Sequence, residues 1–388
     1  MDYILADPAD IRDNLMPMTY TRPVSELRVG ILTLREKWQK FLPGSYSYIT
    51  ADYLSELFPG PAPDDCKSDD AVTLAGDIIP DAALADAVAS LSPGQALYAA
   101  DSNLIASRGN AIEQIIYPGA VKRLRGLTDI FTMNADEITA DFRLLTAGRK
   151  SAPLSPTVTV VGDPSLVFLD ENAVAECCFI NVNGGPVYIG PDAEVMEASA
   201  LRGPIAVCRH STVNMGSKIY GGTTIGPWSK VGGELNNVVI HSYSNKAHDG
   251  FLGNAVIGAW CNIGAGCVAS NLKNDYTEIK LWNYPAHRFL RTGLQFCGLI
   301  MGDHSKAGIN TMFNTATVIG VGVNIHGTGF QRNFVASFSE GGTAGFSDVP
   351  MSKFFDVAER VMARRGLTLT DADRRMFFAI REIADNYK

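Results

Sequence analysis

One histidine stands among small and amide side chains in the stretch SYSNKAHDGFLGN, residues 242–254. An imidazole titrates near neutral pH, so His248 could accept a proton from an attacking nucleophile. On both sides of this stretch the chain repeats by sixes, but here the repeat slips. We therefore expect His248 on a loop extruded from a regular scaffold, because such loops hold accessible side chains in fixed positions.

The scaffold is indicated by aliphatic residues that recur every six positions, with mostly small residues four positions after each of them. A period of six fits neither an α-helix nor a long strand, but it fits a parallel β-helix with the aliphatic side chains inside. Glycines directly after several aliphatics permit tight corners. The unbroken run consists of Ile189, Val195, Leu201, Val207, Val213, Ile219, Ile225 and Val231.

This pattern resembles the hexapeptide-repeat acyltransferase family. The resemblance implies a left-handed β-helix, a homotrimer, and acyl-CoA bound in the groove between subunits. Residues 246–271, KAHDGFLGNAVIGAWCNIGAGCVASN, are similar to the acetyltransferase half of the bifunctional bacterial enzymes that N-acetylate glucosamine-1-phosphate and then uridylylate the product. The shared frame is H-x-x-aromatic-L-G-D/N, then N-I-G-A-G, then an asparagine.

Carried over residue by residue, the resemblance makes His248 the general base that takes the proton of the attacking amine. The resemblance also implies that the backbone around Ala265 and the side chain of Asn271 contact acetyl-CoA. These groups would stabilise the developing oxyanion. The family's basic residues for the sugar phosphate do not align, so nearby lysines are candidates for that contact. The expected contacts to the sugar phosphate are Phe251, where the family has tyrosine, Asn262, Lys230 and Lys246.

The first third of the chain has a different texture, with strand-like and helical segments in alternation, which favours an α/β nucleotide-binding domain. Residues 15–23, LMPMTYTRP, and residues 74–80, LAGDIIP, are similar to signatures of sugar-1-phosphate nucleotidyltransferases. The resemblance implies that Thr19 and Arg22 contact the nucleotide and that Asp77 holds Mg2+.

Two parts of the nucleotidyltransferase pattern are absent. The glycine-rich loop that would cradle phosphate is replaced by LADPADIRDN, and the lysine expected after Pro23 is Val24. Residues 1–150, and the stretch TRPVSELRVGILTLREKW within them, resemble a divergent, Bacteroidetes-type branch of the bifunctional enzymes. Arg28, Arg35 or Lys37 could then replace the missing cation, and Lys37 is the expected nucleotide contact.

Charge and hydropathy exclude two classes of partner. The net charge is −8 and the cations are scattered, so we expect no binding to nucleic acid. No apolar run approaches the ~20 residues that would span a bilayer, and the N-terminus lacks a secretory signal pattern, so we expect no membrane partner and a cytoplasmic protein.

The expected fold is an α/β nucleotidyltransferase-like domain over residues 1–155, a left-handed β-helix acyltransferase domain over 156–345, and a helical tail over 346–388 that covers the open end of the β-helix. Residues 276–284 alternate like a strand and are expected to leave the coil.

The predicted function is N-acetylation of an amino-sugar 1-phosphate from acetyl-CoA, with glucosamine-1-phosphate as the expected acceptor. Transfer of a nucleotidyl group from UTP in the presence of Mg2+ would follow, giving UDP-N-acetylglucosamine. Two alternatives remain open. Only one of the activities is retained, or the chain is a non-catalytic regulatory or assembly protein that binds sugar nucleotides.

Overall fold

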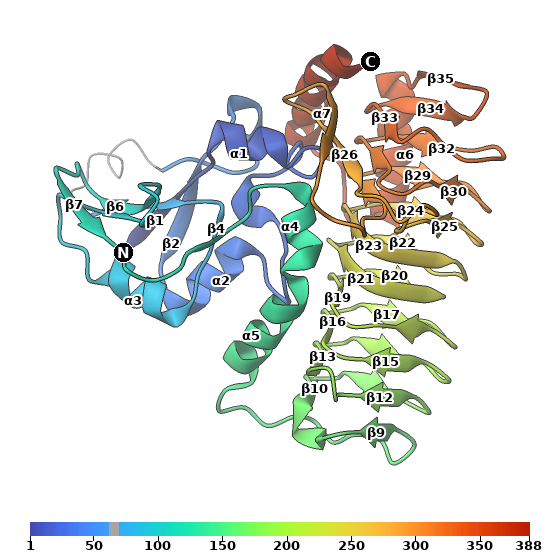
Figure 1. Ribbon diagram of the computed structural model, residues 1–388, viewed down its shortest axis with the longest axis horizontal. Coiled ribbons are helices and arrows are strands. Elements are labelled where there is room, and N and C mark those ends of the chain that lie inside the picture. Colours follow the sequence, from blue (N-terminus) through green and yellow to red (C-terminus); the bar gives the residue numbers. More distant parts are fainter. Residues whose placement is uncertain (62–69) are drawn as a thin grey trace. The chain divides into compact units, whose positions relative to one another are not determined.

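The computed structural model describes residues 1–61 and 70–388, and the chain divides into two compact units (Figure 1). The first unit consists of Met1–Leu27, Leu32–Gly126 and Asp371–Ala379. The second consists of Arg28–Ile31, Leu127–Thr370 and Ile380–Lys388. The predicted boundary near residue 155 therefore falls inside the second unit, since helices α4 (Leu127–Thr132) and α5 (Asn134–Thr146) pack on the β-helix.

The first unit is built around a mixed sheet with the strand order β2-β1-β3-β6-β5-β7. Strand β1 pairs in parallel with both β2 and β3, so the carboxyl ends of β1 and β3 lie at one edge of the sheet. The strands are β1 (Asp2–Ala6), β2 (Ser45–Ile49), β3 (Val72–Ala75), β5 (Gln95–Tyr98), β6 (Leu104–Arg108) and β7 (Glu113–Ile116), with a small pair β4 (Ile78–Ile79) and β8 (Lys122–Arg123). The helices are α1 (Ala9–Asn14), α2 (Leu34–Phe41) and α3 (Ala82–Ala89).

The second unit is a parallel β-helix of short strands, stacked as rungs in Figure 1. Its lower coils contain β9 (Thr159–Val161), β10 (Val167–Leu169), β11 (Val174–Ala175), β12 (Phe179–Asn181), β13 (Val187–Ile189), β14 (Glu194–Val195), β15 (Ala200–Arg202), β16 (Ile205–Val207), β17 (Thr212–Val213), β18 (Lys218–Ile219), β19 (Thr223–Ile225) and β20 (Lys230–Val231). Its upper coils contain β21 (Glu234–Ile240), β22 (Asn245–Lys246), β23 (Phe251–Ile257), β24 (Asn262–Ile263), β25 (Val268–Ala269), β28 (Ile300–Met301), β29 (Lys306–Ala307), β30 (Met312–Phe313), β31 (Val318–Ile319), β32 (Asn324–Ile325), β33 (Phe334–Val335) and the antiparallel pair β34 (Ser339–Gly342) and β35 (Gly345–Asp348).

The six-residue period is confirmed as the inward-facing column of this β-helix. Every aliphatic of the predicted run from Ile189 to Val231 is at most 1% exposed, and all of them belong to one hydrophobic core. The inside of the prism excludes water, so one apolar residue per short strand is what drives the coils to stack. The predicted fold class, an α/β domain followed by a β-helix and short helices, is confirmed.

The prediction of an extruded loop around His248 is wrong. Strands β22 and β23 flank residues 247–250, which form an ordinary corner of the coil. The repeat looks broken because a lysine, Lys246, occupies the inward position that pairs with Val231. In addition, the step between successive inward side chains shortens from six residues to four between Val231 and Leu235. It is five between Leu235 and Ile240 in β21 and between Leu252 and Ile257 in β23.

The real excursion from the coil lies further along the chain. Strands β26 (Lys280–Asn283) and β27 (Arg288–Arg291) form an antiparallel hairpin between β25 and β28. The predicted departure of residues 276–284 from the repeat is confirmed.

Helix α6 (Met351–Ala363) lies along the side of the coils, so the prediction that the tail covers their open end is wrong for this helix. The Phe354 ring contacts the rings of His304 and Phe338, with centroids 5.8 and 5.1 Å away. Just beyond the helix, Arg365 Nη2 donates a hydrogen bond to the backbone oxygen of Trp228, several coils lower, at 3.1 Å. The apolar stripe of α6 therefore packs on a corner of the β-helix.

The last α-helix of the chain is α7 (Asp371–Ala384), and its two parts belong to different compact units. Asp371–Ala379 cluster with the first unit and Ile380–Lys388 with the second. No helix in the described ranges is long and apolar enough to cross a membrane.

Candidate acyl-transfer and nucleotide sites

One face of the β-helix carries a column of outward-facing amide and ammonium groups. Parallel pairing aligns Lys230 with Asn245, Asn245 with Asn262, and Lys306 with both Asn262 and Asn324. Each of these residues directly precedes an inward-facing residue, so each points away from the core. The five residues belong to successive coils and form one polar stripe.

Rings line the corner beside this stripe. Each of these corner residues has a positive φ, and for Tyr243 and Trp260 it is 54° and 62°. Their rings stack with centroids 4.1 Å apart and an interplanar angle of 8°. The ladder continues on both sides through His210, Trp228 and His304. Stacking between coils compensates for a backbone conformation that bulky residues rarely adopt.

Between the polar stripe and the end of α6 lies a cavity of about 630 Å³. His248 lines it from the corner between β22 and β23, and its side chain is exposed. Among the described residues, those that line the cavity include four cations and no carboxylate, so the cavity favours an anionic ligand. The lining residues that carry the argument are His248, Asn262, Lys230, Lys306, Arg364 and Arg365.

Lys306 is the most enclosed of the four cations. Its Nζ donates a hydrogen bond to the backbone oxygen of His304 at 2.7 Å. Burial lowers the pKa of Lys306 to about 8, because desolvation disfavours the charged form. The ammonium of Lys306 is thus weakly hydrated, and a bound anion would stabilise its charged form.

The structure brings three of the residues predicted for acyl transfer into one cavity: His248, Asn262 and Lys230. The other four do not line it. Phe251 stands on the next face of the coil, and Ala265 sits in a corner where its oxygen accepts from Asn310 N. Asn271 Nδ2 donates to Asn254 Oδ1 at 2.8 Å, and Lys246 points into the core.

Sequence reasoning missed Lys306 and the two arginines. Lys306 could have been found by aligning whole coils, because it precedes an inward residue as Lys230 and Asn262 do. Arg364 and Arg365 reach the cavity only because α6 packs along the coils. No local pattern near residue 364 indicates that contact.

In the first unit, Asp77 follows β3 at the edge where β1 also ends. It is 1% exposed, and Arg123 Nη1 donates to both of its carboxylate oxygens at 3.0 Å. Burial raises the pKa of Asp77, and the Arg123 guanidinium opposes that effect.

The carboxylate predicted to hold Mg2+ at this edge is Asp77. Asp7, which follows β1 at the same edge, accepts hydrogen bonds from Val24 N at 2.9 Å and from Thr50 Oγ1 at 2.8 Å. Among residues 1–61 and 70–388 there is no group of three or more His, Cys, Asp or Glu side chains that could hold a metal ion. Mg2+ is often held by one or two carboxylates together with substrate phosphates. Asp77 would then be the protein ligand, and the ion would have to displace Arg123.

The other residues predicted for the nucleotide lie as follows. Thr19 is buried and donates from Oγ1 to Arg12 O at 2.6 Å, and Arg22 is half-buried with Nη2 donating to Thr21 Oγ1 at 3.2 Å. Lys37 is 1% exposed, on the inner face of α2. Arg28 belongs to the second unit.

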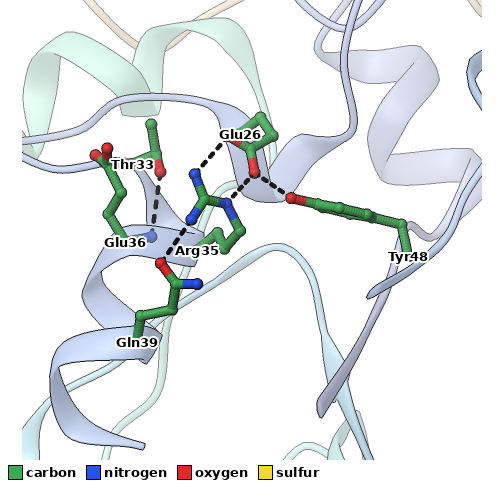
Figure 2. A network of polar contacts seen from close by, with 6 residues as sticks. All are labelled: Glu26, Thr33, Arg35, Glu36, Gln39 and Tyr48. Carbon is green, nitrogen blue, oxygen red and sulfur yellow. Dashed lines mark hydrogen bonds and ion pairs between the residues drawn. The ribbon is translucent and has the colours of Figure 1, made fainter. Parts of the chain in front are cut away.

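Arg35, the remaining candidate for the missing cation, is held within a polar network (Figure 2). Its guanidinium pairs with Glu26 and donates to Gln39 Oε1 at 2.6 Å. Tyr48 donates to the same Glu26 carboxylate at 2.5 Å. The positive charge of Arg35 is therefore already balanced.

Comparison with known proteins finds similarity to sugar nucleotidyltransferases and to bifunctional enzymes. Residues 3–150 match the family model described as sugar nucleotidyl transferase. The chain is 28% identical over 118 residues to the bifunctional protein GlmU of Methanocaldococcus jannaschii, covering 30% of this chain and 26% of that protein. It is 29% identical over 144 residues to a bifunctional sugar-1-phosphate nucleotidylyltransferase/acetyltransferase of Sulfurisphaera tokodaii. That alignment covers 37% of this chain and 35% of the relative.

Among solved structures, the chain is similar to a UDP-N-acetylglucosamine acyltransferase from Francisella novicida. The alignment covers 61% of this chain and 76% of the acyltransferase chain, at 13% identity and a TM-score of 0.29. The chain spans about a quarter to a third of the length of the two bifunctional relatives. The predicted resemblance to the bifunctional nucleotidyltransferase/acetyltransferase family is confirmed, and the class these relatives define is a transferase.

Proposed function

We propose that this chain transfers an acetyl group from acetyl-CoA to the amine of an amino-sugar 1-phosphate, with glucosamine-1-phosphate as the acceptor, in the cytoplasm. The observation that carries the proposal is the cavity, which combines one exposed imidazole with four cations and no carboxylate. An anionic amino sugar needs both features, because its amine must lose a proton and its phosphate must be neutralised.

In the proposed reaction His248 accepts a proton from the amine as its nitrogen attacks the thioester carbonyl carbon. The carbon–sulfur bond then breaks, and the imidazolium returns the proton to the leaving thiolate. Asn262, on the polar stripe, would orient the sugar. The contacts of Ala265 and Asn271 with acetyl-CoA remain predictions, since neither residue lines the cavity.

The test is a single incubation of the protein with acetyl-CoA, glucosamine-1-phosphate, UTP and Mg2+, with products identified by mass. The acetylated sugar phosphate is expected. A UDP-sugar in addition would support nucleotidyl transfer. Recovery of unchanged substrates, with glucosamine-1-phosphate bound in equilibrium dialysis, would instead support a non-catalytic binding protein.

Arg364 and Arg365 are expected to hold the acceptor's phosphate. We expect Arg364→Gln/Arg365→Gln to raise the KM for glucosamine-1-phosphate by about 10-fold to 100-fold, since hydrogen bonds to charged groups contribute about 1.5 to 3 kcal/mol. The KM for acetyl-CoA should change less than twofold. Arg360→Gln, which replaces an exposed arginine in the last turn of α6, serves as the matched control. An equal rise in both KM values would contradict the assignment.

We propose that the chain acts as a homotrimer, with copies meeting at the corner that carries Asp249 and Ala265. Met215 and Ile309 lie on that corner and are 65% and 70% exposed, which is unusual for large apolar side chains. Light scattering of the wild type should return about three times the chain mass of 41.7 kDa. Ile309→Glu should reduce the measured mass, and a monomeric wild type would refute the trimer.

A second activity, nucleotidyl transfer from UTP, is favoured by the family match over residues 3–150. We propose that it uses the edge where β1 and β3 end, with Asp77 in contact with the phosphates through Mg2+. The opposing observations are the missing glycine-rich loop and the balanced charge of Arg35. The residues proposed for the two activities belong to separate compact units, so each activity can be tested by its own substitutions.

A further inference from the structure

We propose that Lys246 is a positioning residue that holds the His248 corner from inside the β-helix. The proposal rests on the acyl-transfer function for its effect on rate, but not for its effect on structure. Lys246 was expected to contact substrate, and the structure instead places it in the core, 2% exposed, directly below the corner.

The inward column that contains Lys246 is otherwise apolar. Its neighbours in register are Val231 below and Ile263 above, both at most 2% exposed. Burying an ammonium in such a column costs several kcal/mol, whereas an unbranched apolar side chain of similar length would fit without that cost. Packing of the coil therefore does not require a lysine here.

What the ammonium supplies is hydrogen bonds to two successive corners. Lys246 Nζ donates to the backbone oxygen of Gly232 at 2.9 Å and also to that of His248. The first oxygen belongs to the corner of the coil below and the second to the catalytic corner itself. Lys246 thus ties the His248 backbone to the neighbouring coil.

Other corners satisfy their carbonyls with short side chains. Ser217 Oγ donates to Asn214 O at 2.5 Å, and Thr311 Oγ1 donates to Gly308 O at 2.8 Å. In each case the hydroxyl stands two residues before the next inward residue of the coil.

At the two corners joined by Lys246, the residue two positions before the next inward residue is a glycine. Gly233 has a φ of +75°, and a Cβ at Gly250 would lie 2.0 Å from Cys267 O. No serine or threonine can stand there without strain. A long side chain from the core column supplies the missing donor instead. Without it the buried carbonyl of Gly232 would lose this hydrogen bond, which is costly.

The consequence for catalysis is that the His248 backbone is fixed while its imidazole stays exposed to the cavity. Asn214 Nδ2 adds a second tie, to Ala247 O at 2.8 Å. A general base must lie within hydrogen-bond reach of the proton it takes, so a corner that moves loses rate without losing substrate affinity.

The test compares Lys246→Met with the wild type in amide hydrogen exchange of residues 247–250 and in acetyl-transfer kinetics. We expect exchange at the corner to rise at least about 10-fold, and kcat to fall about 10-fold to 100-fold with KM changed less than twofold. Val213→Ala, in the same inward column two coils lower, is the matched control. It should lower the melting temperature without either effect.

Unchanged exchange at residues 247–250 in folded Lys246→Met would overturn the inference, and so would faster exchange with wild-type kcat. If Lys246→Met does not fold, Lys246→Gln, which keeps a donor of shorter reach, is measured in the same way and judged by the same two criteria. If the wild type transfers no acetyl group, the proposed function fails, whereas the exchange result still decides whether Lys246 holds the corner.

Discussion

Replacement of His248 by asparagine is expected to lower kcat for acetyl transfer by roughly 10²-fold to 10⁴-fold, the usual contribution of a general base. Substrate affinity should change little, because the imidazole acts mainly in the transition state. The fold should survive, since the side chain is exposed on a corner whose backbone is held by Lys246 and Asn214. Steady-state kinetics on the purified variant measures the effect.

The pH dependence gives this prediction a second readout. The kcat/KM of the wild type should fall towards acidic pH, where a general base is protonated, and His248→Asn should lose that acidic limb. His210→Asn, a half-buried histidine in the ring ladder of a lower coil, is the control and should keep both rate and profile. A folded His248→Asn protein with wild-type kcat would remove the catalytic assignment.

Asp77→Asn is expected to abolish turnover of UTP while acetyl transfer continues. The loss should reach roughly 10³-fold, because charge stabilisation of several kcal/mol corresponds to a factor of ten per 1.4 kcal/mol. Asp77 is the buried carboxylate at the edge where β3 ends, and it lies in a different compact unit from the acyl-transfer cavity. Pyrophosphate release from UTP and sugar phosphate measures the effect.

The complication is that Asp77 also pairs with Arg123, so its replacement leaves a guanidinium that is only 10% exposed without an anion. Breaking a buried pair in this way typically destabilises a protein by about 3 to 5 kcal/mol. The double variant Asp77→Asn/Arg123→Gln removes both charges and should recover the melting temperature but not UTP turnover. Recovery of turnover in the double variant would show that Asp77 serves the fold and not the reaction.

The period of six was enough to predict the β-helix, because each inward aliphatic is repeated locally and its burial drives the stacking of coils. It was not enough near residue 246. A lysine in the inward column hides one inward position. The step of four residues from Val231 to Leu235 and the steps of five within β21 and β23 also shift the phase of the repeat. An interpretation based on apolar residues alone therefore predicted an extruded loop where the structure has an ordinary corner of the coil.

The sequence by itself determined the order of the two parts, the coil and the candidate base, since short-range spacing carries that information. Asn262 pairs in register with Asn245, three residues before His248, so His248 and Asn262 are nearly one full coil apart and a β-helix places them near each other. Only the tertiary structure decided which charges surround them. Lys306 belongs to the stripe because it pairs with Asn262, 44 residues away in the chain. Arg364 and Arg365 line the cavity because the apolar face of α6, the helix directly before them, packs on the coils. Contacts of that kind depend on which surfaces bury each other, and no local pattern encodes them.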